Sequence, residues 1–224
     1  LGLGSRVRCM GLSVTKHEIY NPSGKCLFEF DTSAYGSQVY VAPRPLLRQA
    51  LLESLPPDSV SFATRFICLD RGDHDNFVTV HLRDMDRNSN EALNAECVIG
   101  ADGCRSQVRK YLARPGVSRP AGVATFRATV WNQDLDMYPM HTFRDIWSEA
   151  DGLGFRGRFG CIRVTQNEVY WWCACDSPSP CQSGSSILVS PILRPYKRKI
   201  VDRLSNFPFR AADLVSSTQE SAIN

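Results

Sequence analysis

The sequence predicts an α/β fold, because helical and strand patterns alternate along its 224 residues. The clearest helical stripe has apolar residues at i, i+3, i+4 and i+8: Leu47, Ala50, Leu51 and Leu55. The stretch VYWWCAC, residues 169–175, is rich in aromatic side chains, which favour a pleated sheet. Residues 97–109 run from an apolar strand through Gly-Ala-Asp-Gly into a predicted helix, as at ligand-binding edges of α/β sheets.

The remaining elements follow from local patterns of apolar spacing and turn residues. Asn21-Pro22-Ser23-Gly24 is the turn of an expected hairpin, and Pro56-Pro57 ends the helix that begins near Pro43. Expected strands cover residues 17–20, 26–30, 38–42, 59–70, 76–83, 95–100, 122–131, 157–164 and 168–175. Further helices are expected at residues 106–112, at 196–204 and after Pro208.

Composition excludes several classes of protein. A net charge of +3, with 43% hydrophobic and 22% charged residues, is ordinary for a globular domain and argues against a nucleic-acid partner. No stretch approaches the roughly 18–20 apolar residues of a transmembrane segment, and no secretory signal opens the chain. Nine irregularly spaced cysteines favour a reducing compartment. We therefore expect an intracellular protein, cytoplasmic or organellar, with a plastid as one candidate, and not a secreted one.

The segment CVIGADGCRSQVR carries most of the functional information. Gly100 and Gly103 allow a sharp turn and close approach of the backbone to a ligand. Asp102 places a carboxylate at the turn, where it can bind a hydroxyl or hold the loop, and the first amides of the following helix can face phosphate oxygens. A plain β-turn stabilised by Asp-Gly is the alternative reading.

The same segment resembles the "DG" motif of class A FAD-dependent monooxygenases, the aromatic-ring hydroxylase, salicylate hydroxylase and zeaxanthin epoxidase type. The family pattern is an apolar strand, Asp-Gly, two residues, Ser, two residues and Arg. Asp102, Gly103, Ser106 and Arg109 stand in that register. In the family this segment lies near the FAD pyrophosphate and the path of NAD(P)H, so the resemblance makes these four residues candidates for cofactor binding.

Two other segments resemble the same family. VYVAPRPLLRQALLESLP is similar to its strand, Arg, two residues, Leu, and final "LP", and the family's arginine contacts the flavin cofactor, so Arg44 is a fifth candidate. STQESAIN, residues 217–224, resembles the "ATxExxI" segment of the zeaxanthin-epoxidase and salicylate-hydroxylase branch. NEVYWWCAC resembles a strand of that branch with an aromatic pair.

We expect the chain to lack two motifs of the family, GxGxxG and GD. LGLGSR, at the start, has neither a preceding strand nor a third glycine and is read as a turn, so it is not the GxGxxG turn that holds the ADP part of FAD. The "GD" motif that binds the ribityl chain lies downstream of ATxExxI in the family and is also missing. With Leu1 at one end and Asn224 at the other, we expect an internal, incomplete part of a family member.

The resemblance implies an incomplete FAD/NAD(P)-binding fold of the aromatic-hydroxylase type with a β-sheet substrate domain. Residues 1–42 would supply strands of the substrate domain, and 43–116 a portion of the FAD-binding domain with the DG motif. Residues 117–208 would form the substrate-domain sheet, and 209–224 would return toward the FAD domain.

For the complete protein the resemblance implies FAD- and NAD(P)H-dependent hydroxylation or epoxidation of a small apolar or aromatic substrate with O2, through a flavin hydroperoxide. NADH and NADPH both remain open, no catalytic side chain is assigned, and the oligomeric state is left open. Two alternatives are a non-catalytic remnant or interaction module of the fold, and a related flavin reductase or halogenase.

Tyr170 and Trp172 share one strand face and form either core packing or the wall of an aromatic pocket. No metal site is expected, because Cys173, Cys175 and Cys181 lack zinc-like spacing.

Overall fold

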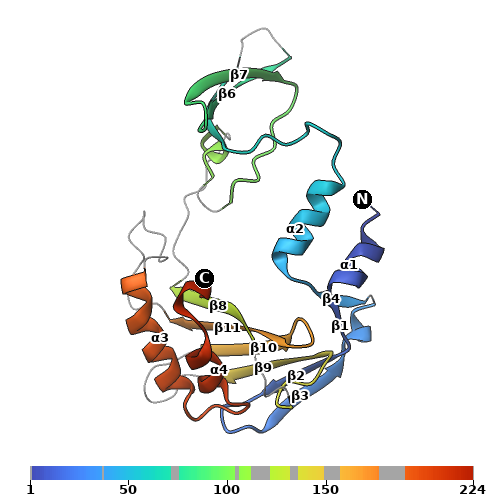
Figure 1. Ribbon diagram of the computed structural model, residues 1–224, viewed down its shortest axis with the longest axis vertical. Helices are drawn as coiled ribbons and strands as arrows, with labels where there is room; N and C mark the ends of the chain where they lie inside the picture. Colours follow the sequence, from blue (N-terminus) through green and yellow to red (C-terminus); the bar gives the residue numbers. More distant parts are fainter. Residues whose placement is uncertain are drawn as a thin grey trace. The chain divides into compact units, whose positions relative to one another are not determined.

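The computed structural model describes residues 2–36, 38–71, 76–103, 106–111, 122–131, 136–148, 157–176 and 190–223. Contacts divide the chain into two compact units, which are described separately (Figure 1). The first unit consists of Leu1–Ser54 and Pro120–Asn224, and the second of Leu55–Arg119. Among the described residues, none of the helices has the length and apolar character needed to cross a membrane.

A six-stranded sheet forms the first unit, with the strand order β3-β2-β9-β10-β11-β8. Neighbouring strands are antiparallel except for β2 and β9, which run parallel. The strands are β2 (Lys16–Tyr20), β3 (Cys26–Asp31), β8 (Val123–Trp131), β9 (Thr142–Ser148), β10 (Gly157–Arg163) and β11 (Glu168–Asp176). Two segments more than a hundred residues apart in sequence therefore meet in the middle of one sheet.

In the described part of the chain, helices pack on one face of this sheet (Figure 1). They are α3 (Ser190–Leu204), α4 (Ala211–Ser217) and the 3-10 turn Glu220–Ala222. Side chains of β8, β9, β10 and β11 point into this helix-side core and are buried: Phe126, Ala128, Ile146, Phe159, Cys161, Val169, Trp171 and Cys173. Burial raises the pKa of the Cys161 and Cys173 thiols to about 12, so both stay neutral. In β8 the buried Phe126 and Ala128 alternate with exposed Thr125, Arg127 and Thr129, as expected for a strand with one covered face.

Thr218 links the C-terminal segment to the centre of this core. The Trp171 indole N–H donates to Thr218 Oγ1 at 2.9 Å, and that hydroxyl donates to the Leu214 carbonyl at 2.8 Å. Trp171 is 0% and Thr218 1% exposed, so neither group has water as an alternative partner. Lys197 Nζ closes the same turn by donating to the carbonyls of Ser216 and Thr218.

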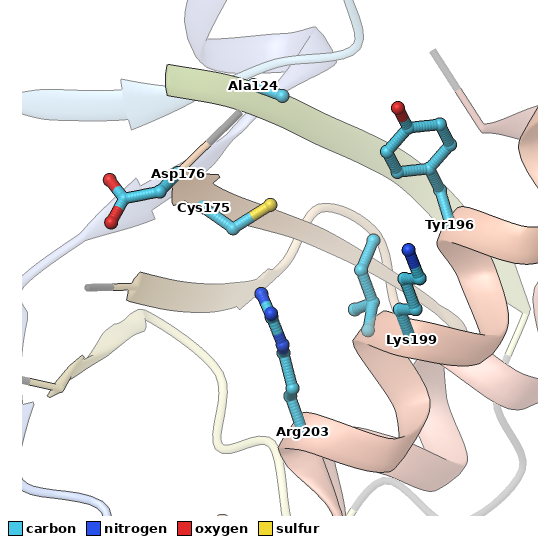
Figure 2. A pocket seen from close by; sticks show the side chains of 7 residues that line it. Ala124, Cys175, Asp176, Tyr196, Lys199 and Arg203 are labelled. Atoms are coloured by element: carbon cyan, nitrogen blue, oxygen red, sulfur yellow. The ribbon is translucent and has the colours of Figure 1, made fainter. Parts of the chain in front are cut away.

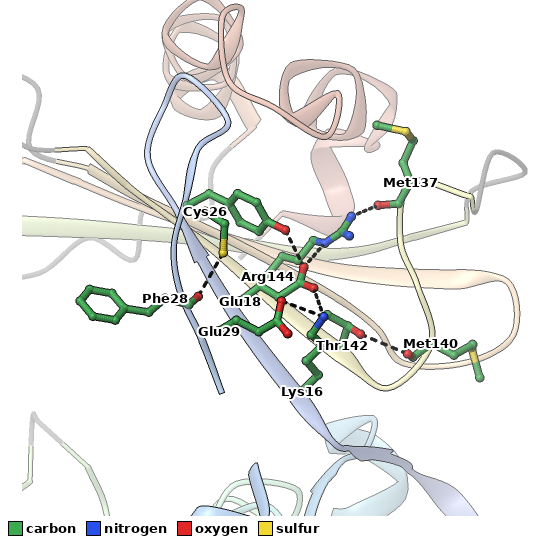
Figure 3. Close-up of polar contacts among 10 residues, drawn as sticks. Lys16, Glu18, Cys26, Phe28, Glu29, Met137, Met140, Thr142 and Arg144 are labelled. Atoms are coloured by element: carbon green, nitrogen blue, oxygen red, sulfur yellow. Dashed lines mark hydrogen bonds and ion pairs between the residues drawn. The ribbon is translucent and has the colours of Figure 1, made fainter. Parts of the chain in front are cut away.

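A buried polar network fastens β2 to β9 where these strands run parallel (Figure 3). Glu18, 5% exposed, accepts from Arg144 Nε at 2.8 Å and from the Tyr20 hydroxyl at 2.9 Å, and pairs with Lys16 Nζ at 2.9 Å. Arg144 also donates to the Met137 carbonyl at 2.6 Å. Burial alone would raise the pKa of Glu18, but the hydrogen bonds from Lys16, Arg144 and Tyr20 lower it overall.

The segments that come before and after the β2–β3 hairpin in the sequence form a smaller layer. The helices α1 (Gly4–Met10) and α2 (Arg44–Glu53) contact each other, and Arg6 pairs with Glu53. Strands β1 (Leu12–Val14) and β4 (Val39–Val41) pair antiparallel. Val14 of this pair packs with Ile162 and Val164 of the large sheet, so the small layer covers one end of the sheet face that lacks helices.

The second unit is an antiparallel meander of β5 (Thr64–Arg71), β6 (Val78–Asp84) and β7 (Ser89–Ala95), followed by the 3-10 turn Val108–Tyr111. A register shift between Phe66 and Cys68 marks a β-bulge in β5. Phe66 packs edge-on against Tyr111, with ring centroids 6.0 Å apart. This contact fastens the turn after the Asp-Gly segment to the meander.

Most expected elements are present, with shifted ends. The hairpin at residues 17–30, the helix near 44–55, the strands at 122–131, 157–164 and 168–175, and both C-terminal helices are confirmed. The turn expected at LGLGSR is wrong, since α1 begins at Gly4. Strand β9 was not foreseen, because its residues TFRDIWS mix charged and apolar side chains without strict alternation. The functional division into domains stays a prediction.

Two corrections concern the glycine-rich segments. The strand expected at residues 95–100 is wrong, since β7 ends at Ala95 and no described strand pairs with residues 97–100; Ile99 is 86% exposed there. Residues 152–157, GLGFRG, have GxGxxG spacing, contrary to the expectation that the chain lacks it. Residues 152–156 lie outside the described part, and Gly157 opens antiparallel strand β10 rather than a helix, so this is not a dinucleotide fingerprint.

Replacing Thr218 by valine should destabilise the protein more than replacing it by serine. Thr218→Val leaves the buried Trp171 N–H without an acceptor, at a cost of about 2 kcal/mol, whereas Thr218→Ser keeps the hydroxyl and loses a methyl group worth about 0.8 kcal/mol. Chemical unfolding of both variants measures the difference. A serine variant as unstable as the valine variant would contradict the role given to the hydroxyl.

The stability of the first unit should fall as the pH drops below about 4.5, the ordinary pKa of glutamate, and Glu18 should be a main cause. Because the folded-state pKa of Glu18 is lowered, its stabilisation is complete above the unfolded-state pKa and is lost as the pH falls through the folded-state pKa. Glu18→Gln should lower the unfolding free energy by about 2 kcal/mol at pH 7 and flatten its decline in acid. Glu29→Gln, an exposed partner of the same Lys16, is the control; equal acid slopes for Glu18→Gln and wild type would refute the assignment.

Candidate functional site

Asp102 organises the Asp-Gly corner in the second unit. Its carboxylate accepts from the backbone N–H of Gln107 at 2.6 Å and of Val108 at 3.3 Å. A hydrogen bond with the Ser106 hydroxyl, and to a smaller extent those from the two amides, hold the pKa of Asp102 below its ordinary value. The carboxylate is therefore ionised at neutral pH. Ser106 Oγ in turn accepts from the Arg109 N–H at 3.0 Å, which is the capping role expected for a serine before a short helix.

The two glycines of this corner have different roles. Gly103 has φ +80°, in the left-handed region that favours glycine, and a Cβ there would meet no atom of the described residues within 4 Å, its chain neighbours aside. Gly100 is crowded instead, since a Cβ there would lie 2.8 Å from the Val108 Cβ. Arg109 donates through its guanidinium to the Gly103 carbonyl at 3.2 Å. Among the described residues, the corner is therefore closed on the Gly100 side and open at Gly103.

Arg44 lies in the first unit as the first residue of α2. Its side chain is exposed, and Pro45 occupies the first turn, where a missing N–H costs nothing. No side chain caps this helix start. A guanidinium at the positive end of a helix is electrostatically unfavourable unless it meets an anion, which agrees with a phosphate-binding role.

The structure thus brings four of the five expected cofactor-binding residues together. Asp102, Gly103, Ser106 and Arg109 form one hydrogen-bonded corner of the second unit. Arg44 belongs to the other unit, and its joint action with this corner stays a prediction.

A further cluster lies on the face of the large sheet that α3 and α4 leave uncovered. Arg158 of β10 pairs with Asp145 of β9, with Nη2 and Oδ2 2.8 Å apart. Its guanidinium carbon also lies 4.6 Å from the Trp147 ring centre and 5.3 Å from that of Trp172. The Arg158 side chain is nevertheless 49% exposed, so it is fixed in place and still offers donors to a ligand.

Buried polar atoms lie beneath Arg158. Asp145 is 1% exposed, and its Oδ1 has no hydrogen-bond partner among the described residues. His17 Nε2, from β2, lies 3.5 Å from Asp145 Oδ2 and likewise has no hydrogen bond within that part of the chain. Gly160 separates Asp145 from Trp172, and a Cβ there would meet the indole Nε1 at 2.2 Å. Glycine is therefore required for the Trp172 indole to lie across β10. We call Arg158, Trp147, Trp172, Asp145 and His17 the open-face cluster.

Sequence reasoning identified only one member of this cluster. The alternation expected in β11 is confirmed, since Trp171 is buried among the helix-side residues while Tyr170 and Trp172 lie on the opposite face. Arg158, Asp145 and His17 were missed because they come from three strands, two of them in parallel register. The only local signal was Gly160 opposite the bulky Trp172, which indicates a ring lying over a strand.

The described residues also line a pocket of about 360 Å³ on the helix side (Figure 2). It lies between the edge strand β8, its neighbour β11 and helix α3. Its lining residues are Ala124, Cys175, Asp176, Tyr196, Lys199, Ile200 and Arg203. Burial raises the pKa of the Cys175 thiol, which leaves it a poor nucleophile. The open-face cluster is on the opposite side of the sheet.

Comparison with known proteins identifies relatives of this chain. The family described as an FAD binding domain matches residues 1–183. Aurachin C monooxygenase/isomerase of Stigmatella aurantiaca is 23% identical over 228 residues, covering 100% of this chain and 53% of that protein. The chain therefore spans about half the length of this relative.

Solved structures share the fold. HpxO of Klebsiella pneumoniae, in complex with FAD and uric acid, has a TM-score of 0.74 at 19% identity, and the match covers 100% of this chain and 53% of the HpxO chain. PqsL of P. aeruginosa, in complex with 2-aminobenzoylacetate, has a TM-score of 0.69 at 19% identity, and the match covers 100% of this chain and 57% of the PqsL chain. The expected fold class, an FAD-binding hydroxylase fold of α/β character, is confirmed by these matches.

Proposed function

Since the chain belongs to the FAD binding domain family, of the class A flavoprotein monooxygenase type, we propose that the complete protein is an FAD-dependent monooxygenase. It would use NADH or NADPH and O2 to add one oxygen atom to a small, planar, aromatic substrate. The observation that carries this proposal is the Asp-Gly corner, in which Asp102, Ser106 and Arg109 hold an open, left-handed Gly103. When bound, the flavin would supply the reaction with oxygen, and the protein would supply binding and orientation.

The residues present fit a dinucleotide phosphate. Among the described residues, its chain neighbours aside, nothing lies within 4 Å of a Cβ position at Gly103, which leaves room there for a ligand. In the first unit, exposed Arg44 is a separate candidate for a charge-assisted hydrogen bond to a phosphate oxygen. Asp102 is engaged by the Gln107 and Val108 amides, so its role is to hold the corner, as a positioning residue.

We assign the open-face cluster to the substrate. Trp147 and Trp172 offer apolar surface to a flat ring, and Arg158 offers donors to an acceptor group on that ring, such as a carbonyl or carboxylate. Uric acid and 2-aminobenzoylacetate, the ligands of the HpxO and PqsL structures, are both rich in such acceptors. Buried Asp145 keeps Arg158 oriented and balances its charge before a ligand binds.

Exposed free thiols support a reducing compartment for the protein. Cys9, Cys26 and Cys97 are exposed and unpaired with one another, and such thiols persist where glutathione and thioredoxin keep cysteines reduced.

The test of the proposal uses the complete protein. It should purify with flavin absorbance and consume NADH or NADPH and O2 in equal amounts when an aromatic acceptor-bearing substrate is present. Arg158→Met should raise the KM for this substrate by about 10–100-fold, the effect of losing a charged hydrogen bond, with unchanged FAD content. Arg158→Lys should recover part of the loss, because it keeps the charge.

Arg87→Met, an exposed turn residue of the second unit, controls for the loss of one positive charge. A protein that retains no flavin would refute the monooxygenase proposal and favour a non-catalytic member of the fold. An unchanged KM in Arg158→Met would refute only the assignment of the open-face cluster.

Arg44→Ala should weaken FAD binding by about 10–100-fold if this guanidinium binds a phosphate. Arg48→Ala is the matched control, since Arg48 is exposed and lies one turn further along α2. Titration of the apoprotein with FAD, followed by quenching of flavin fluorescence, measures both. Equal affinities for the two variants would exclude Arg44 from the cofactor site.

A further inference from the structure

We propose that Cys68, Asp70 and His81, on the meander of the second unit, bind a single zinc ion. One ligand atom from each residue, the Cys68 sulfur, an Asp70 carboxylate oxygen and a His81 ring nitrogen, lies within 4.8 Å of the other two. The site is separate from the Asp-Gly corner and from the open-face cluster, neither of which includes these residues.

The β-bulge in β5 aligns the three side chains. Before the bulge the register pairs Phe66 with Leu82, and after it Cys68 pairs with His81. If the register before the bulge continued without a shift, His81 would lie opposite Ile67, and Cys68 would lie opposite Val80. The bulge therefore places Cys68 directly across from the histidine, and bulges commonly re-aim side chains in this way.

All three ligands share one face of the two strands. Cys68 and Asp70 are two residues apart on β5, so their side chains point the same way, and His81 lies opposite Cys68 on β6. His81 Nε2 is already 2.7 Å from Asp70 Oδ2. Two ligands of one tetrahedral zinc lie about 3.4 Å apart, given bonds of about 2.1 Å, so the pair needs to open by well under 1 Å.

The donor types select the metal. A thiolate with an imidazole nitrogen suits zinc, whereas Mg²⁺ and Ca²⁺ take oxygen ligands. Three protein ligands leave the fourth tetrahedral position to water. The Asp70 and His81 side chains are 70% and 35% exposed, so an ion can enter from solvent. The alternative is a simple His81–Asp70 hydrogen bond beside an uninvolved thiol.

Cobalt(II) is the probe that distinguishes these readings, because thiolate coordination to cobalt gives a charge-transfer absorption in the near ultraviolet. The complete protein, treated with a chelator and dialysed, is titrated with Co²⁺ and then with Zn²⁺ in competition. Cys68→Ser should abolish the charge-transfer band, and His81→Gln and Asp70→Asn should each weaken zinc binding at least about tenfold. Circular dichroism of each metal-free variant verifies that it is folded.

Cys26→Ser is the matched control. Cys26 is an exposed thiol on β3, with its sulfur 3.4 Å from the Phe28 carbonyl oxygen, and its loss should leave the cobalt band and the zinc stoichiometry unchanged. The proposal is overturned if Cys68→Ser and wild type bind equal amounts of zinc with equal affinity. Because the readout is metal binding, its result is independent of whether the protein retains flavin.

Discussion

The parallel pairing of β2 with β9 is the constraint on which both faces of the large sheet depend. On the helix side it brings Glu18 against Arg144, where a buried carboxylate is satisfied by three donors. On the opposite face it brings His17 within 3.5 Å of Asp145, which orients Arg158. Breaking the pairing would leave buried charges uncompensated on one face and separate the open-face cluster on the other. The structural network and the proposed substrate site therefore share one junction.

Much of the fold could be predicted from the sequence, because apolar spacing and alternation within short segments specify the helices and strands. Apolar spacing predicted α2 and the C-terminal part of α3, and the alternation in VYWWCAC predicted that Trp171 points away from Tyr170 and Trp172. The pairing of β2 with β9 could not be predicted from the sequence, because it joins residues 16–20 to 142–146 and no pattern within a short segment specifies such a contact. The apolar run at 97–100 was misread as a strand, because apolar composition does not supply the neighbouring strand that backbone pairing needs.

The same distinction applies to the functional residues. Asp102, Gly103, Ser106 and Arg109 lie within eight residues of one another. A short sequence motif could therefore predict that they form one site. Arg158, Asp145 and His17 come from three strands, and Cys68 meets His81 only through a β-bulge that shifts the register by one residue. In these clusters the chemistry follows from strand register, which sequence patterns specify only indirectly. The substrate site proposed on the first unit and the zinc site proposed on the second both depend on strand register in this way.

A crystal structure of the complete protein with FAD and an aromatic, acceptor-bearing ligand tests the central claim most directly. We predict that the ligand ring lies against Trp172 with its acceptor on the Arg158 guanidinium, and that cofactor phosphate lies beside Gly103. A ligand seated instead in the helix-side pocket near Lys199 and Arg203, or a cofactor remote from the Asp-Gly corner, would contradict this account.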